Sequence, residues 1–236
     1  MTPDGATYRL DEIALLDGLP AEEMRALEQR CAWRRYAVGE QILDRSSNSR
    51  DVFFVVSGKV NVVNFSLSGR EVAYADIGAG GHFGELSAVD NEPRSATVVA
   101  ADKCLLAALP PEPFNDLLMS HPAIMREVLL KLAHIVRISN ERIMDLSTLG
   151  AVQRVHRELL RMAEPDPLTA GSWVIFPLPT QSQIAGHAST TRETVARVIG
   201  TLTAAGIVKR KGKSLYIRDR ARLEAVLARL GDGTVR

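Results

Sequence analysis

The chain has 236 residues, of which 46% are hydrophobic and 24% are charged, so we expect a globular protein with one large domain or two small ones. No stretch approaches the ~18 consecutive apolar residues of a membrane span, and residues 1–11 hold charges where a signal peptide needs an apolar run. Neither Cys31 nor Cys104 has a second Cys or a His at metal-ligand spacing. We therefore expect a cytoplasmic protein without a metal site or a membrane partner.

The net charge of +1 conceals an uneven distribution of charge. Residues 151–236 carry 14 Lys and Arg against 7 Asp and Glu, whereas residues 1–150 carry 15 against 21. A basic half joined to an acidic half indicates a polyanionic partner for the basic half. A chance division of solvated surface charge is the alternative at this point.

The first half of the chain changes from a helical pattern to a β pattern. Apolar residues recur at helical spacing over residues 17–32 and predict a short amphipathic helix. Over residues 38–109, β-branched and aromatic runs such as Val52–Val56 alternate with turn signals such as Ser68–Gly69. This spacing predicts an antiparallel roll or barrel, with its last strand over residues 98–109.

A long helix is predicted after that roll. Pro110 and Pro111 end the last strand, because proline cannot donate to a β-ladder. From Pro122 there is no further Gly or Pro until Gly150, which allows a helix of roughly 45 Å at 1.5 Å per residue. Its four-three apolar seam indicates a dimerisation helix, and packing on its own barrel alone is the alternative. The seam consists of Val128, Leu132, Ile135, Ser139, Leu146 and Leu149.

The second half reads as a small domain of helices with a hairpin. Two short helices joined by a tight turn are expected over residues 180–188 and 191–205, with Thr191 as N-cap and Gly206 ending the second helix. A hairpin is expected around Lys211–Gly212–Lys213. The other predicted elements are a helix over 151–163, a strand over 173–177 and a last helix over 220–230.

Residues 80–99, GGHFGELSAVDNEPRSATVV, carry groups that suit a nucleotide monophosphate. The turn Phe83–Leu86 is rich in backbone N–H groups that can cradle a phosphate, and the Glu85 carboxylate in it can accept hydrogen bonds from sugar hydroxyls. Arg94 offers a planar fork of donors for phosphate oxygens, and Ser95 adds a hydroxyl. The alternatives are a surface ion pair between Glu85 and Arg94 and an ordinary turn at Gly84.

FGEL followed by PRSA resembles the phosphate-binding cassette of cyclic nucleotide-binding domains. The resemblance implies that Glu85 binds the ribose 2′-hydroxyl. It also implies that Arg94 and Ser95 bind the cyclic phosphate together with the backbone amides of Gly84 to Leu86. Phe83 belongs to the same motif.

Residues 180–202, TQSQIAGHASTTRETVARVIGTL, have the spacing of a helix-turn-helix unit, with small Ala185 where two helices cross closely. Arginine can pair with guanine O6 and N7, and glutamate can accept from cytosine N4, so the start of the second helix suits readout of the major groove. The basic hairpin is placed to meet phosphates, with a solvated turn as the alternative. The candidate DNA contacts are Thr180, Gln181, Thr191, Arg192, Glu193, Arg197 and Lys211.

The order of these parts resembles the bacterial CRP/FNR regulators, and in particular their cyclic-AMP receptor branch, over nearly the whole chain. The implied fold is α+β: a β-roll over residues 1–115, a dimerisation helix over 116–150 and a winged helix-turn-helix over 151–236. The implied function is that of a homodimer, not an enzyme, which binds TGTGA-like inverted repeats and contacts RNA polymerase. Ser139 and Asn140 align with the pair that touches the ligand base.

The resemblance names cyclic AMP as the expected ligand and cyclic GMP as the close competitor. Where this branch has an arginine beside the ribose-binding glutamate, the chain has Ile135, with Arg137 as the nearest basic residue downstream. Asn140 and Ser189 also depart from the family pattern. Two cysteines do not suit the iron–sulfur cluster of the oxygen-sensing relatives, and a haem is not expected. A DNA-binding protein whose roll is a structural or interaction module is the remaining alternative.

Overall fold

The computed structural model describes residues 8–65, 71–169 and 171–231, and it divides into two compact units, residues 1–136 and 137–236. The predicted turn at Ser68–Gly69 lies outside the described residues. The division between the units falls within the helix α4 (Pro122–Thr148).

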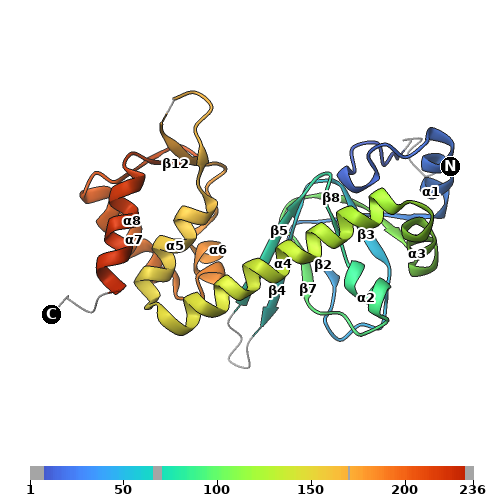
Figure 1. The fold of residues 1–236 in the computed structure, drawn as a ribbon, viewed down its shortest axis with the longest axis horizontal. Helices are drawn as coiled ribbons and strands as arrows, with labels where there is room; N and C mark the ends of the chain where they lie inside the picture. The colour runs from blue at the N-terminus through green and yellow to red at the C-terminus, as the bar shows by residue number, and fades with distance from the viewer. Residues whose placement is uncertain (1–7, 66–70, 170, 232–236) are drawn as a thin grey trace. The chain divides into compact units, whose positions relative to one another are not determined.

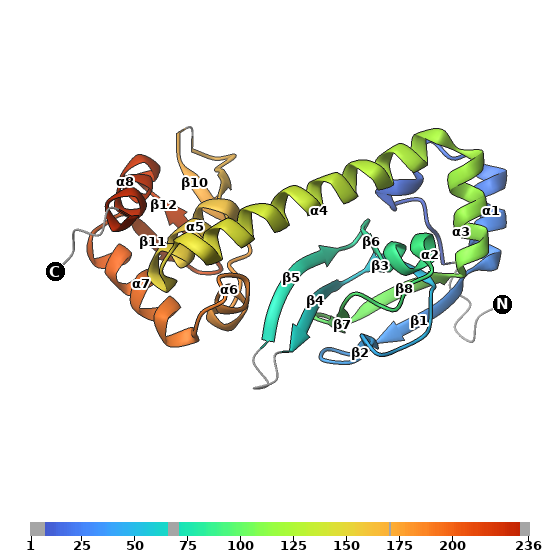
Figure 2. The ribbon, with the colours of Figure 1, turned by 60° about the horizontal axis from the view of Figure 1, so that its bottom comes forward.

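The first unit contains two four-stranded antiparallel sheets, which appear below α4 in Figure 2. One has the strand order β1-β8-β3-β6 and the other β2-β7-β4-β5, which confirms the predicted antiparallel β domain. The strands are β1 (Ala32–Tyr36), β2 (Gln41–Leu43), β3 (Val52–Ser57), β4 (Lys59–Phe65), β5 (Glu71–Gly78), β6 (His82–Phe83), β7 (Thr97–Ala100) and β8 (Cys104–Leu109).

Strand β3 shows why this unit has two apolar cores. Successive side chains of a strand point to opposite faces, and the whole run from Val52 to Val55 is buried. Val52 and Phe54 pack into a core shared with the helices, whereas Phe53 and Val55 pack into a core shared with Val60 and other strand residues. The continuous apolar run therefore fills both faces of its sheet.

The helices of the first unit differ from the predictions at their ends. The N-terminal helix is shorter than predicted, because α1 covers Ala21–Arg30, Pro20 precedes it and Ala32 already begins β1. Helix α3 starts at Pro111. Proline suits the first helical turn, because a backbone N–H at that position would have no acceptor within the helix. The remaining helical elements are η1 (Ala14–Leu16), α2 (Glu85–Asp90), α3 (Pro111–Ser120) and the first part of α4 (Pro122–Thr148).

The prediction of one last strand over residues 98–109 is wrong. The segment forms two strands, β7 and β8, which belong to different sheets. The backbone N–H groups of Ala101 and Asp102 both donate to the carbonyl of Lys59, and this turn carries the chain from one sheet to the other.

Helix α4 is apolar along two parts of its length that have different environments. Ile124 and Val128 are buried in the helical core of the first unit, and Leu132 packs against that core. Farther along, Ile135 is 41% exposed and Ile143 is 59% exposed. The early seam residues therefore pack on their own unit, while the later apolar residues are exposed on the chain considered alone.

The second unit combines the helices α5 to α8, labelled in Figure 1, with a four-stranded sheet of order β11-β12-β10-β9. The predicted helix pair, hairpin and last helix are present, and the one element not expected is the short strand β9 after α5. Val155, Ile184 and Leu215 are fully buried at the centre of its core. The elements are α5 (Ala151–Met162), β9 (Glu164–Pro165), β10 (Trp173–Ile175), α6 (Gln181–His187), α7 (Arg192–Ala204), β11 (Val208–Lys211), β12 (Ser214–Ile217) and α8 (Arg220–Gly231).

Candidate functional site

Gly84 makes a close turn between β6 and α2. Its φ of 87° lies in the left-handed region, which glycine adopts without the steric cost of a side chain. A Cβ at this position would lie 2.8 Å from Arg94 Nη1 and 2.8 Å from the Asp51 carbonyl oxygen. Gly84 is therefore more than an ordinary turn residue, because only glycine lets the backbone approach the arginine this closely.

Arg94 is buried against that turn, with 4% of its surface exposed. Nη1 donates to the Gly84 carbonyl at 3.0 Å, while Nη2 donates to Ser49 Oγ at 3.1 Å and to the Asp51 carbonyl at 2.8 Å. Nε has no hydrogen-bond partner within the described part of the chain. Burial lowers the pKa of Arg94 and the charges of Asp51 and Glu85 oppose it, so the guanidinium stays positive and its Nε donor is unused.

Glu85 forms an ion pair with a residue that the sequence analysis did not consider. Its Oε1 lies 3.0 Å from Lys131 Nζ on α4, and the same ammonium donates to the His82 carbonyl at 2.6 Å. Burial lowers the pKa of Lys131, and the attraction of Glu85 opposes that effect. The alternative of a surface ion pair between Glu85 and Arg94 is wrong, because both residues are only 4% exposed.

Ile135 occupies the position at which the family pattern has its arginine, and Lys131 lies one helical turn before it. Residues four apart share a helix face, so a search one turn in either direction from Ile135 is the signal that could have found it. The ion pair of Glu85 is therefore with Lys131 and not with a residue at position 135 or 137.

His82 is a further buried titratable group beside this ion pair. Burial, and then the positive charge of Lys131, lower its pKa to about 4, while Glu85 acts in the opposite direction. Its Nε2 has no hydrogen-bond partner among the described residues. The imidazole is therefore neutral at neutral pH, and the sequence analysis assigned it no role.

The structure brings four of the predicted ligand residues together: Phe83, Gly84, Glu85 and Arg94. The Phe83 ring stacks on the Phe53 ring with centroids 5.1 Å apart. The side chains of Leu86 and Ser95 are exposed next to them. Ser139 and Asn140 are exposed on the part of α4 that belongs to the second unit, and their contact with a ligand stays a prediction.

The chemistry of the cassette fits one phosphate and one sugar hydroxyl. The first-turn amides of a helix lack partners within the helix, so the amides that follow Gly84 are available to an anion. Arg94 Nε is a buried charged donor without a partner among the described residues. Glu85, held by Lys131, is the buried carboxylate of the motif and can accept from a hydroxyl.

In the second unit, α6 and α7 form the predicted helix-turn-helix pair. Thr180 caps α6 by accepting from the Gln183 amide at 3.2 Å, and Thr191 caps α7 by accepting from the Thr194 amide at 3.3 Å. Ser189 in the turn between them has a φ of 48°. Both caps lie where the sequence pattern placed the helix starts.

Arg154 of α5 fixes this turn, although the sequence analysis did not identify it. Its Nε donates to the Ala188 carbonyl at 2.9 Å and its Nη2 to the Ser189 carbonyl at 3.0 Å. Its Nη1 donates to the Leu149 carbonyl at 2.8 Å. One side chain thus ties the helix-helix turn to the segment that joins α4 and α5.

Helix α7 separates a buried apolar side from a charged side. Val195, Val198 and Leu202 are buried, whereas the side chains of Arg192 and Arg197 are exposed. The helix can therefore present charges outward without disturbing its core. The other predicted contacts also have accessible side chains: Thr180, Gln181, Thr191, Glu193 and Lys211.

Glu193 begins the charged side of α7. Hydrogen bonds from its own backbone amide and then from the Thr191 side chain lower the pKa of Glu193. The carboxylate is therefore ionised at neutral pH, as an acceptor for a cytosine amino group requires.

The hairpin β11–β12 is basic, as predicted. Lys209, Arg210 and Lys211 are exposed on β11, and Gly212 forms the turn with a φ of 58°. Exposed lysines and arginines on a hairpin suit contacts to a phosphate backbone.

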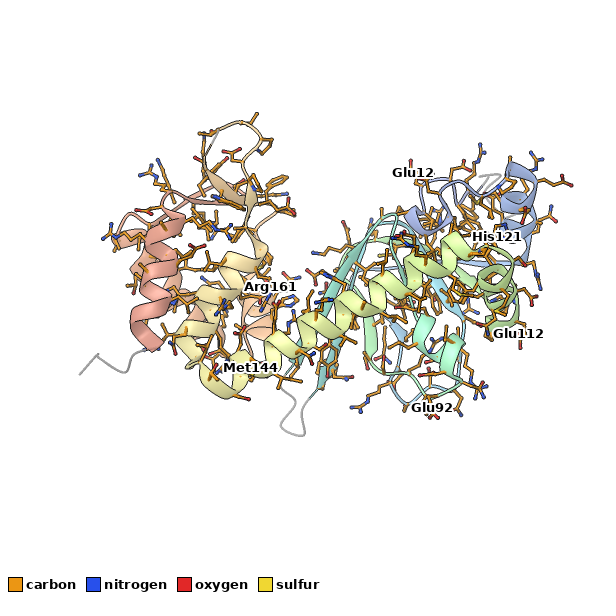
Figure 3. The ribbon with its side chains drawn as sticks, viewed as in Figure 1. Glu12, Glu92, Glu112, His121, Met144 and Arg161 are labelled. Atoms are coloured by element: carbon orange, nitrogen blue, oxygen red, sulfur yellow. The ribbon has the colours of Figure 1, made fainter. Side chains whose placement is uncertain are left out.

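A charged cluster joins the end of α4 to α5 within the second unit. Arg161, labelled in Figure 3, places Nη2 3.1 Å from Asp145 Oδ2 and Nη1 2.8 Å from Glu158 Oε2. Glu158 is 3% exposed, so its pairing with Arg161 supplies the positive charge that a buried carboxylate requires. The last turns of α4 are therefore fastened to the unit that carries the helix-turn-helix.

The described residues contain neither a membrane-spanning helix nor a cluster of metal-ligating side chains. No helix there is long and apolar enough to cross a membrane. No group of three or more His, Cys, Asp and Glu side chains gathers as a metal site would require in that part of the chain.

Both halves of the chain match known protein families. The model of the cyclic nucleotide-binding domain matches residues 33–121, and the model of the Crp-like helix-turn-helix domain matches residues 153–226. The Cyclic AMP receptor protein of Thermus thermophilus is 31% identical over 212 residues, which cover 90% of this chain and 95% of that protein.

Two other relatives extend the comparison. The cAMP-activated global transcriptional regulator Vfr of Pseudomonas aeruginosa is 28% identical over 79% of this chain and 89% of that protein. The solved structure of a CooA mutant from Carboxydothermus hydrogenoformans is 21% identical, with a TM-score of 0.77 over 90% of this chain and 95% of that one, and supports the fold. The chain belongs to the CRP/FNR family of DNA-binding transcription regulators with a cyclic nucleotide-binding domain, and it is not an enzyme.

Proposed function

We propose that the chain is a cytoplasmic, homodimeric transcription regulator that responds to cyclic AMP and binds TGTGA-like inverted repeats. The proposal that the ligand is a cyclic nucleotide rests on the surroundings of Arg94. This arginine is a buried cation that is packed against Gly84 and has a spare Nε donor. The proposed domains are a ligand-binding β-roll over residues 1–115, a dimerisation helix over 116–150 and a DNA-binding domain over 151–236.

In this proposal the cyclic phosphate binds Arg94, Ser95 and the amides from Gly84 onward. The ribose 2′-hydroxyl donates to Glu85, and Lys131 keeps that carboxylate in place through the ion pair at 3.0 Å. Phosphate and sugar are thus recognised by opposite charges, which suits a cyclic nucleotide better than a simple anion.

The base would be recognised from α4 by Ser139 and Asn140. Cyclic AMP is favoured because two of the relatives carry that ligand in their names. Cyclic GMP is the alternative, because an amide side chain such as Asn140 both donates and accepts and can therefore pair with a guanine edge.

The homodimer is supported by the apolar residues that α4 leaves exposed. Val136 is 58%, Ile143 is 59% and Leu146 is 52% exposed on the chain considered alone. A seam of apolar residues at helical spacing is what a two-stranded helical interface buries.

Gating follows if ligand binding favours the dimer whose recognition helices match successive major grooves. Arg192, Glu193 and Arg197 would then read base edges, Thr180, Gln181 and Thr191 would support that contact, and Lys211 would meet phosphates. A partner in the transcription machinery, RNA polymerase, is part of the same proposal.

Calorimetric titration with cyclic AMP, cyclic GMP and 5′-AMP tests the ligand. Arg94→Lys keeps a positive charge but loses the planar fork, so we expect it to weaken cyclic AMP binding about 10- to 100-fold. The matched control is Arg50→Lys, at an exposed arginine nearby, which should bind as the original protein does. Equal binding of cyclic AMP by both variants would remove Arg94 from the site.

Fluorescence anisotropy with a TGTGA inverted repeat and a scrambled duplex tests the gating. We expect saturating cyclic AMP to tighten binding to the specific duplex about tenfold or more, which corresponds to ~1.4 kcal/mol. Identical DNA affinity with and without any cyclic nucleotide would support the alternative, in which the β-roll is a structural module.

A further inference from the structure

A cavity suited to a small molecule lies in the second unit. It has a volume of about 530 Å³ and is bounded by α5, α7 and α8. Small-molecule sites in proteins have volumes of ~300–1,000 Å³ and commonly lie between packed helices. The cassette residues do not line it, because they belong to the first unit.

Most of the wall is apolar. Val152 comes from α5, Val198 and Leu202 from α7, Ile207 from the start of the hairpin segment and Val226 from α8. Because the transfer of apolar surface out of water is favourable, such a wall suits the hydrocarbon part of a ligand.

The charged groups of the wall all have one sign. Among the lining residues, all of which the structure describes, only Arg197 and Arg222 are charged and none is an aspartate or glutamate. Arg222 Nη1 makes a long hydrogen bond of 3.3 Å to the Ala205 carbonyl, which leaves its other donors for a ligand.

His156 adds a neutral polar group to the same wall. It is 4% exposed, and burial lowers its pKa, so it stays uncharged at neutral pH. A hydrogen bond to the Val152 backbone acts in the opposite direction to burial. An apolar wall with two guanidinium groups and a neutral imidazole fits a ligand with a hydrocarbon body and a single anionic head.

We propose that this cavity binds a small amphipathic carboxylate, whose tail lies among the apolar side chains and whose head pairs with Arg222 and Arg197. Arg197 is also the side chain proposed to read a base, so the bound carboxylate competes with DNA for it. This competition rests on the proposed DNA-binding function, whereas binding of the carboxylate does not.

Binding is tested with octanoate on the full chain by calorimetry, with 1-octanol as the uncharged probe of the same tail. Ala225 and Ala221 are both exposed on α8, but only Ala225 lines the cavity. We expect Ala225→Phe to weaken octanoate binding about tenfold or more by filling the cavity, and Ala221→Phe to leave it unchanged. Arg222→Gln should reduce the preference for octanoate over 1-octanol, because only Arg197 then remains to pair with the carboxylate.

The same variants separate the cavity from its effect on DNA. We expect octanoate to weaken binding to the TGTGA duplex severalfold in the original protein and in Ala221→Phe, but not in Ala225→Phe. No octanoate binding at millimolar concentration, or equal binding by Ala225→Phe, overturns the site. Octanoate binding that leaves DNA affinity unchanged overturns the competition, and a protein that binds octanoate but no DNA contradicts the proposed function alone.

Discussion

The cassette and the recognition helix use the same kinds of charged side chain in opposite surroundings. Glu85 and Arg94 are both 4% exposed, and each is held by partners from distant parts of the chain. Arg192 and Arg197 are exposed on α7, whose stability comes from its buried apolar side. Charge is part of the folded core in the first region and an addition to its surface in the second.

This difference predicts that stability and function are linked in one region and separable in the other. Removing a buried charge leaves its hydrogen-bond partners unsatisfied in a medium that cannot replace them. Removing an exposed charge exchanges it for water at small cost.

Arg94→Ala should have the largest effect on stability. It removes three hydrogen bonds and leaves the Gly84 and Asp51 carbonyls without this donor, so we expect a loss of about 4 kcal/mol in the free energy of unfolding. The chain has two tryptophans, Trp33 in the first unit and Trp173 in the second. Urea unfolding in a Trp173→Phe background therefore reports the first unit alone through Trp33 fluorescence.

The matched control for that measurement is Arg50→Ala, at an exposed arginine, which should change stability by less than about 0.5 kcal/mol. Similar urea midpoints for Arg94→Ala and Arg50→Ala would contradict the view that Arg94 is part of the folded core.

The next effect is a pH dependence of the first unit that arises from His82. Its pKa is lowered to about 4 in the folded chain, from an ordinary value near 6.5, so the unfolded chain binds more protons between these values. Stability should therefore rise with pH through this window and fall by about 3 kcal/mol as the pH drops from 7 to 4. Urea unfolding at several pH values, followed by Trp33, measures it.

His82→Gln should flatten this pH dependence, because glutamine does not titrate. His134→Gln, at an exposed histidine, should leave it unchanged. A pH dependence that persists in His82→Gln would assign the effect to other groups, of which Lys131 and Glu85 face His82 most directly.

Arg197→Ala tests the exposed side of the comparison. We expect it to weaken binding to the TGTGA duplex about 10- to 100-fold and to lower discrimination against a substituted base, with the free energy of unfolding changed by less than about 0.5 kcal/mol.

Lys211→Ala should weaken binding to all duplexes alike and reduce the salt dependence of binding by about one ion. Anisotropy at several salt concentrations distinguishes the two results, and a large loss of stability in Arg197→Ala would contradict the separation.

The parts of the molecule that could be predicted are those decided by neighbouring residues. The caps at Thr180 and Thr191 depend on hydrogen bonds that span three residues, so local sequence contains them. The turn at Gly84 and the alternation in Val52–Val55 are equally local. The order of the parts, read from the same local patterns, is what carries the family resemblance.

The features that could not be predicted depend on how distant segments meet. Lys131 pairs with Glu85 because α4 and the cassette pack in one register, which no local pattern reveals. Arg154 donates to the Ser189 carbonyl from a position 35 residues earlier in the sequence, so this contact also depends on tertiary packing. The break between β7 and β8 has no Gly or Pro in Ala101–Lys103 to mark it, because the sheet-to-sheet crossing is stabilised by the Lys59 carbonyl.

Ser189→Gly should produce the smallest effect, and its sign is opposite to the others. Ser189 has a φ of 48°, where a side chain is disfavoured, while Arg154 binds its carbonyl and not its hydroxyl. Glycine relieves the strain and keeps that hydrogen bond, so we expect a gain of about 0.5–1 kcal/mol in the second unit. Urea unfolding followed by Trp173 fluorescence in a Trp33→Phe background measures this gain.

Ser182→Gly, inside α6, is the matched control and should lower the free energy of unfolding by about 1 kcal/mol. A loss in both variants would mean that the flexibility glycine adds to the unfolded chain outweighs the strain at Ser189, and that the turn depends on Arg154 more than on local conformation.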